Sequence, residues 1–144
     1  MTLGHWQFPK EFDVEEWCGF TYCITNLTTG KRYFGKKSFW STTRKRVAGR
    51  RNRKVTVKES SWRTYTGSSD ALNADIEALG KDNFHFQIVG LHESKASLSY
   101  AEIKLIIWND ALVQENNFYN RMLPPIKFKV NNPTDKEGKY HIGR

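Results

Sequence analysis

Two tyrosines are the first side chains in this sequence whose types and spacing could perform chemistry. Tyr22 and Tyr33 lie in two short runs rich in aromatic and β-branched residues, separated by the turn-forming segment Leu27 to Gly30. If the runs form a hairpin with that segment as its loop, Tyr22 faces Gly35, and both phenols lie on one face roughly 7–8 Å apart. Two hydroxyls could then converge on one small group. The alternative is a pair of ordinary strand tyrosines, which the hairpin alone allows equally.

Glu102 is the second candidate, because it lies within or beside an apolar stripe of helical spacing. The stripe consists of Leu98, Ala101, Leu105, Trp108 and Leu112, and it predicts a helix from Ser94 or Ser97 to about Val113 that packs against a sheet. An unpaired carboxylate is costly there and normally has a partner or a metal ion. The alternative is a capping box, in which Ser99 starts the helix and Glu102 only accepts a backbone N–H bond. The earlier serines favour the mid-helix position.

A basic segment from Lys36 to Lys58 contains no acidic residue after its first position. So dense a run of like charges usually forms a solvated loop or tail. A mobile basic segment beside a hairpin can also contact phosphates, which gives strongly salt-dependent binding. The two interpretations are compatible.

The elements that must position these residues form a small α+β fold. Segment 65–70 is typical of a turn and cap before a helix from Ala71 to Leu79, which Gly80 ends. Apolar residues then alternate with polar ones over 83–91, which predicts a third strand that pairs with the hairpin. We therefore expect a three-stranded, mainly antiparallel sheet flanked by helices.

Length and composition favour one intracellular domain that binds a polyanion. The 144 residues suit a single domain, and 23 Lys and Arg against 15 Asp and Glu give a net charge of +8. No apolar run is long enough to span a membrane, and the first residues do not resemble a signal peptide, so we expect a cytoplasmic protein without a membrane partner. Cys18 and Cys23 are expected to be free thiols. The expected parts are a lead-in over 1–17, a domain over 18–123 with a basic insert at 36–58, and a basic tail over 124–144.

The order of these motifs resembles the GIY-YIG nuclease superfamily. The resemblance is carried by Phe-Thr-Tyr at 20–22, Tyr-Phe-Gly at 33–35 and Tyr-Thr-Gly-Ser-Ser at 65–69, and it covers about residues 18–121. It is closest to small phage-type endonucleases related to homing enzymes. Phe20, Thr21 and Phe34 depart from the usual triplets. The implied fold is the α+β arrangement expected above.

The resemblance implies a DNA endonuclease that hydrolyses phosphodiester bonds in double-stranded DNA with Mg²⁺ or Mn²⁺. It places Tyr22 and Tyr33 in the catalytic pair, with Tyr22 favoured as the base, and Glu102 on the metal. Further implied catalytic residues are Asn120 in a supporting role and Arg44 on the scissile phosphate, with Arg46 as second choice because Thr43 occupies the usual arginine position. The family's frequent His or Tyr beyond the arginine is missing here, and Lys36, or else Lys37, is expected to take its catalytic place. The residues expected to bind DNA are Lys37, Arg46, Arg50, Arg51, Arg53 and Lys54.

A catalytically inactive basic module that binds DNA or RNA is the alternative function. Such a module needs the arginines but no metal-binding carboxylate, so Glu102 distinguishes the two. The sequence leaves open the recognition sequence, the cleavage pattern, the oligomeric state and the biological role.

Overall fold

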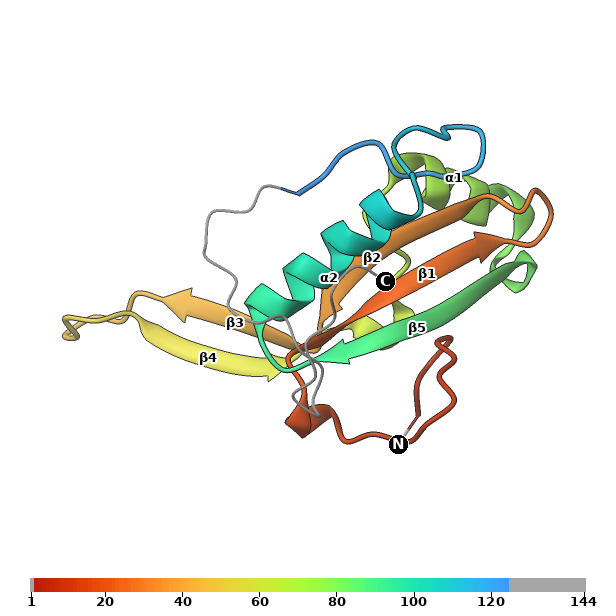
Figure 1. Cartoon of the computed structure of the whole chain (residues 1–144). Helices are drawn as coiled ribbons and strands as arrows, with labels where there is room; N and C mark the ends of the chain where they lie inside the picture. The colour runs from red at the N-terminus through yellow and green to blue at the C-terminus, as the bar shows by residue number, and fades with distance from the viewer. Residues whose placement is uncertain (1, 125–144) are drawn as a thin grey trace.

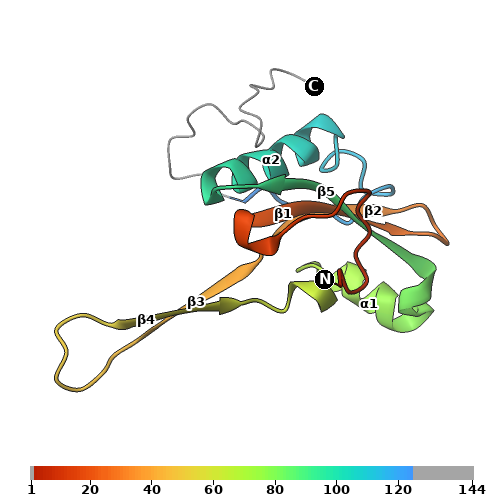
Figure 2. The ribbon, with the colours of Figure 1, turned by 90° about the horizontal axis from the view of Figure 1, so that it is seen from below.

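The computed structural model describes residues 2–124, and every structural statement below refers to that part of the chain. Its centre is an antiparallel sheet of three strands, β1 (Gly19–Asn26), β2 (Arg32–Ser38) and β5 (Phe84–His92), in the order β2-β1-β5. Helix α2 (Lys95–Trp108) covers one face of the sheet, and α1 (Asp70–Leu79) lies on the other side (Figures 1 and 2). The α+β prediction is confirmed.

The hairpin register is the one predicted from the turn. Tyr22 pairs with Gly35 and Ile24 with Tyr33, and Asn26 donates its backbone N–H to the carbonyl of Lys31 at 2.8 Å. Strand β1 is buried along almost its whole length, because it lies between two strands and both faces of the sheet are covered. Both tyrosines therefore project to the same face.

Each face of the sheet has its own apolar core. Phe20, Tyr22 and Ile24 of β1 pack on one face with a group that includes Trp62 and Leu72. On the opposite face, beneath α2, the core consists of Cys23, Phe34, Ile106, Ala111 and Phe118. This separation matters for the site, because residues of neighbouring positions on β2 enter different cores.

The lead-in packs on the domain through its aromatic side chains. Trp6 is only 3% exposed and donates its indole N–H to the carbonyl of Trp62 at 2.6 Å. Gln7 forms a parallel bridge with Gln87 beside β5. A 3₁₀ turn follows at Val14–Glu16; two others lie at Trp62–Thr64 and Lys81–Asn83.

The basic insert forms a hairpin where the charge pattern predicted a loop. Strands β3 (Trp40–Lys45) and β4 (Lys54–Glu59) pair as a separate two-stranded sheet that projects from the domain (Figures 1 and 2). Threonines of β3 lie opposite Val57 and Thr56 of β4, and such β-branched cross-strand pairs favour a pleated backbone. We call residues 40–59 the ribbon.

Helix α1 agrees with the prediction, whereas α2 ends earlier than predicted. Ser94 caps the start of α2, which excludes the capping box at Ser99, and the helix ends at Trp108 instead of about Val113. Asp110, which has φ of 53°, then turns the chain away from the helix axis.

The buried face of α2 also differs from the predicted stripe. It comprises Leu98, Ser99, Glu102 and Ile106, whereas Trp108 is 52% and Leu112 38% exposed. Glu102 is thus at the centre of the face that contacts the sheet. None of the helices described is long and apolar enough to cross a membrane. The predicted tail lies outside the described residues except for Pro124.

Candidate active site

A pocket at the outer edge of β2 brings together three of the predicted site residues. Tyr33, Glu102 and Asn120 line it together with Ser68. The remaining lining residues are Phe34, Ile106, Met122 and Pro124. The segments involved are far apart in the sequence, so the fold rather than any local motif assembles this pocket.

The position of β2 at the edge of the sheet explains how these side chains meet. Tyr33 projects to the face that carries Tyr22, whereas Phe34 projects to the face beneath α2, where Glu102 lies. Within the described residues, β2 pairs with β1 on one side, and no strand pairs with it on the other, where the backbone bridge joins Arg32 to Phe118. Groups from both faces can therefore reach around the open edge.

The side chains of Tyr22 and Tyr33 are in contact, and Tyr33 is the one that lines this pocket. The ring centroids of Tyr22 and Tyr33 are 6.2 Å apart, and the Tyr33 hydroxyl lies 3.1 Å from Oγ of Ser68. Tyr22 is buried and also contacts Tyr65, with ring centroids 6.1 Å apart. Tyr33 lines the pocket, whereas Tyr22 is outside the lining and packs against Tyr33.

Burial raises the pKa of both phenols. The pKa of Tyr22 is well above its usual value because of burial and then the neighbouring Tyr33 and Tyr65. Burial also raises the pKa of Tyr33, although its hydrogen bond to Ser68 acts in the opposite direction. Both hydroxyls are therefore protonated at neutral pH in the substrate-free protein. Tyr22, favoured as the base from sequence, has the more strongly disfavoured phenolate of the two.

Gly35 gives the Tyr22 hydroxyl its space. A Cβ atom at position 35 would overlap the Tyr22 hydroxyl and lie 2.5 Å from its Cζ atom. Gly67, which has φ of +87°, lies near the same hydroxyl, since a Cβ atom added at position 67 would be 3.3 Å from it. The tyrosine can adopt this position only because position 35 has no side chain.

We therefore expect Gly35→Ala to lower the cleavage rate by about 10²-fold, because the displaced Tyr22 ring would push the adjoining Tyr33 ring out of position, and a shift of about 1 Å can cost this much. Gly90→Ala is the matched control, since Gly90 is also a strand glycine, and its added Cβ would meet only side-chain atoms at 3.3 Å or more. Single-turnover kinetics of both variants test this. A Gly35→Ala protein that cuts as fast as the Gly90→Ala protein would show that the phenol's position is unimportant.

Glu102 offers an unsatisfied carboxylate oxygen. Its side chain is 9% exposed, and among the described residues Oε1 is buried without a hydrogen-bond partner. Burial raises the pKa of this carboxyl, while the Lys36 ammonium and backbone N–H lower it. Lys36 in turn donates from Nζ to Oγ of Ser99 at 2.6 Å.

These donors fit a hard divalent cation. Mg²⁺ in nucleases and related enzymes is commonly held by one or two carboxylates together with waters and substrate phosphates. Within residues 2–124 no cluster of three or more His, Cys, Asp or Glu side chains could form an all-protein cage. A single carboxylate that lines a pocket and has one unpaired oxygen is the type of site that completes its coordination with substrate.

Asn120 fixes the outer edge of β2. Its Oδ1 accepts the backbone N–H of Phe34 at 3.0 Å, and its Nδ2 donates to the Phe34 carbonyl at 2.9 Å. The amide thereby takes the place of a neighbouring strand. The geometry gives Asn120 a positioning role for the strand that carries Tyr33 and Lys36.

The structure does not bring the predicted arginines to this pocket. Arg44 lies on β3 and Arg46 directly after it, and both are exposed and outside the pocket lining. Lys37 stands 4.4 Å above the ring of Tyr65, on the phenol side of β2. The other predicted DNA-binding residues, Arg50, Arg51, Arg53 and Lys54, are exposed in the outer half of the ribbon.

Sequence reasoning missed Ser68 and Tyr65 as parts of the site. Both belong to the Tyr-Thr-Gly-Ser-Ser stretch, which predicted a turn and helix cap. The cap exists, since Oγ of Ser69 accepts the backbone N–H of Leu72. The first serine of the pair instead faces Tyr33. No local pattern in the sequence indicates this contact, because it joins residues 35 positions apart.

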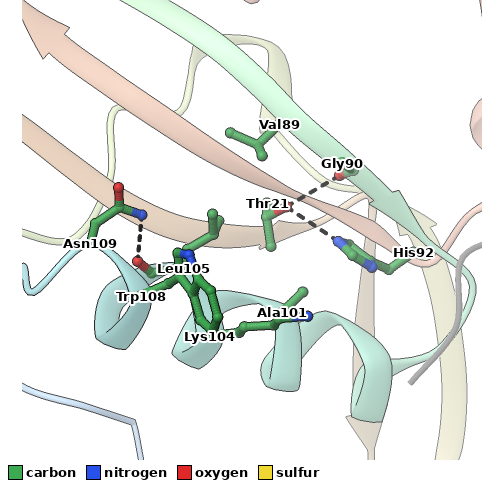
Figure 3. Close-up of a pocket in the computed structure, with 9 residues that line it drawn as sticks. All are labelled: Thr21, Val89, Gly90, His92, Ala101, Lys104, Leu105, Trp108 and Asn109. Atoms are coloured by element: carbon green, nitrogen blue, oxygen red, sulfur yellow. Dashed lines mark hydrogen bonds between the residues drawn. The ribbon is translucent and has the colours of Figure 1, made fainter. Parts of the chain in front are cut away.

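A second pocket lies between α2 and β5 and has a different character (Figure 3). It shares no lining residue with the pocket at β2 and is largely apolar, with Leu105 and Trp108 on its helical side. His92 lies 3.2 Å from the Thr21 hydroxyl, and burial lowers its pKa to about 4, so that it is neutral. This pocket contributes no group to the chemistry at β2.

Comparison with known proteins agrees with this geometry. A family model described as "Putative endonuclease segE, GIY-YIG domain" matches residues 5–123. No curated protein and no solved structure gives a significant match. The matched range contains the tyrosine pair, the ribbon, Glu102 and Asn120. The chain therefore belongs to the SegE-type GIY-YIG family, and it is a nuclease whose substrate is nucleic acid.

Proposed function

We propose that the protein is an endonuclease that hydrolyses phosphodiester bonds of double-stranded DNA in the pocket at β2, with Mg²⁺ or Mn²⁺ as cofactor. The observation that carries the proposal is the buried Oε1 atom of Glu102, which has no hydrogen-bond partner among the described residues. An inactive binding module has no need of such a costly group. The likeness to phage-type homing enzymes supports a role in the mobility of a phage or other element.

The chain's own residues have distinct tasks in this reaction. Tyr33 orients the attacking water through its hydroxyl, and Ser68, 3.1 Å away, holds the phenol in place. Lys36 balances the charge of Glu102, and Ser99 holds its ammonium through the hydrogen bond at 2.6 Å. A bound divalent cation supplies charge stabilisation to the phosphoryl and leaving oxygens.

Proton transfer from the water is assigned to the tyrosine pair. Tyr33 is the phenol that opens on the pocket, so we assign it the direct contact with water and give Tyr22 the supporting position. A divalent cation held at Glu102 would bring positive charge close to Tyr33, which would favour its phenolate. An arginine on the scissile phosphate, predicted as Arg44, has no support from the described geometry.

Nicking of supercoiled plasmid is the experiment that tests this function. We expect conversion to nicked or linear DNA with Mg²⁺ or Mn²⁺, no conversion with EDTA, and little cutting of single-stranded DNA or RNA of the same sequence. Binding is measured in parallel by gel shift. Tight binding without cutting under any of these conditions would instead identify the inactive module.

A further inference from the structure

The ribbon presents two chemically different faces. Residues paired across β3 and β4 project to the same side, and successive pairs alternate. One face, here called the mixed face, carries Thr42, Arg44, Val55 and Val57, with Trp40 and Glu59 at its base next to the domain. The opposite face, here called the lysine face, carries Thr43, Lys45, Lys54, Thr56 and Lys58.

The mixed face is apolar at its centre, although none of the residues between 2 and 124 covers it. Val55 is 55% and Val57 59% exposed, and every residue of β4 is exposed. The ribbon projects from the other described elements in both views (Figures 1 and 2). Two valines on a projecting, highly charged arm therefore indicate a function outside the domain's own core.

The charge of the ribbon selects the class of partner. The strands and their connecting loop hold basic residues on every side, and the first acidic residue is Glu59 at the base. This complements a polyanion. A two-stranded ribbon fits the major groove of B-DNA, which is about 12 Å wide, and it does not fit the narrow major groove of double-stranded RNA.

We propose that the ribbon enters the major groove of double-stranded DNA with its mixed face on the base edges. This inference rests on the proposed function. Arg44 suits the O6 and N7 acceptors of guanine, and the methyl groups of Thr42, Val55 and Val57 suit the thymine methyl group. The long side chains of the lysine face reach the phosphates that border the groove. Arg44 is thus a specificity residue rather than a ligand of the scissile phosphate.

The length of the chain limits where these contacts fall. From Tyr33 to Arg44 the polypeptide can span at most about 36 Å, at roughly 3.3 Å per residue. One base pair rises about 3.4 Å, so the bases contacted lie within about ten base pairs of the cut and on one side of it. This arm would therefore extend the recognised sequence beyond the cleavage position, while the cut itself is made at the pocket.

Two ribbon variants separate the faces. The mixed-face variant is Arg44→Gln with Val55→Thr and Val57→Thr, which preserves the β-branched side chains on β4. The lysine-face variant is Lys45→Gln with Lys54→Gln and Lys58→Gln. Short random-sequence duplexes bound by each protein in EDTA are sequenced to give base preference, and affinity is measured over a range of salt concentrations.

We expect the mixed-face variant to lose base preference in one block of positions. The lysine-face variant should keep that preference, weaken binding to all duplexes alike, and flatten the slope of log affinity against log salt by about two to three units, at roughly 0.9 for each phosphate that is no longer neutralised. Unchanged base preference in the mixed-face variant, or loss of preference in the lysine-face variant, would overturn the proposal.

A second measurement needs no substitution and is independent of cutting. Duplexes methylated at guanine N7, in the major groove, or at adenine N3, in the minor groove, are tested for binding to the unaltered protein in EDTA. N7 methylation should weaken binding roughly tenfold, and N3 methylation should have little effect. Interference from N3 alone would overturn the proposal. A protein that shows N7 interference but never cuts DNA would refute the proposed function and leave the ribbon's role intact.

Discussion

Glu102→Gln is expected to lower the single-turnover rate of DNA cleavage by about 10³-fold or more. Removing the charged oxygen removes the anchor for a divalent cation, whose stabilisation of phosphoryl charge amounts to several kcal/mol. The shape of the side chain is preserved, so DNA affinity measured in EDTA should stay within a few-fold. Cleavage at the normal rate by the folded variant would reduce Glu102 to a structural residue.

The same variant should be at least as stable as the unaltered protein at neutral pH without metal. Burial raises the pKa of Glu102 above that of the unfolded chain. The folded state therefore binds this proton more tightly, and the associated stability, present below the usual carboxyl pKa, is lost as the pH rises through the folded pKa. Thermal unfolding at several pH values tests this, because Gln cannot titrate and should remove that part of the pH dependence.

Tyr33→Phe is expected to slow single-turnover cleavage by about 10²-fold or more, the scale for removing a general acid or base, with little change in binding. The ring is retained, so only the hydroxyl that faces Ser68 and the pocket is removed. Tyr22→Phe is the comparison variant and should have a smaller effect, because its hydroxyl is buried between Gly35 and Gly67 and supports its neighbour. A larger decrease in Tyr22→Phe would reverse the two assignments.

The pH dependence of the rate identifies which phenol accepts the proton. Because burial raises the pKa of both phenols, the phenolate fraction is small at pH 7 and grows as the pH rises toward the phenol pKa. The rate of the unaltered protein should rise over this range, and the rise should disappear in Tyr33→Phe while it persists in Tyr22→Phe. Profiles that coincide in all three proteins would exclude a tyrosine base.

The hairpin could be predicted from sequence because its turn and its register are local properties. Once Leu27 to Gly30 form the loop, the opposition of Tyr22 to Gly35 follows, and the structure has that register. The distance between the rings, 6.2 Å, could not be predicted, since it depends on the glycines and on Tyr65 from a distant segment.

The orientation of α2 shows where periodicity misleads. The most regular apolar positions, which include Trp108, predicted the buried face, yet the buried face is rotated toward Ser99, Glu102 and Ile106. When a helix buries a carboxylate and a serine, apolar spacing alone does not identify its buried face. The inference that Glu102 lies inside the fold was nevertheless correct, because it rested on the cost of an unpaired buried charge.

Charge density misled in the ribbon for a related reason. Like charges predicted a loop, but alternation distributes them over two faces, and the paired threonines and valines favour strands. Because a strand fixes the direction of each side chain, the arginines beyond Thr43 are directed along an arm instead of into the pocket. Counting residues from a family motif could not reveal that the chain leaves the domain at Phe39.

The measurement that tests the central claim most directly locates the divalent cation in the protein bound to DNA. Amide resonances of the slowly cutting Tyr33→Phe protein, in complex with a short duplex, are followed as Mn²⁺ is added in substoichiometric amounts. We predict paramagnetic broadening first at the amides of Phe34, Lys36 and Asn120. A protein that carries both Tyr33→Phe and Glu102→Gln should show no selective broadening at these amides. Selective broadening at another part of the chain, or the same broadening in the Glu102→Gln protein, would contradict the assignment of this pocket as the metal-dependent active site.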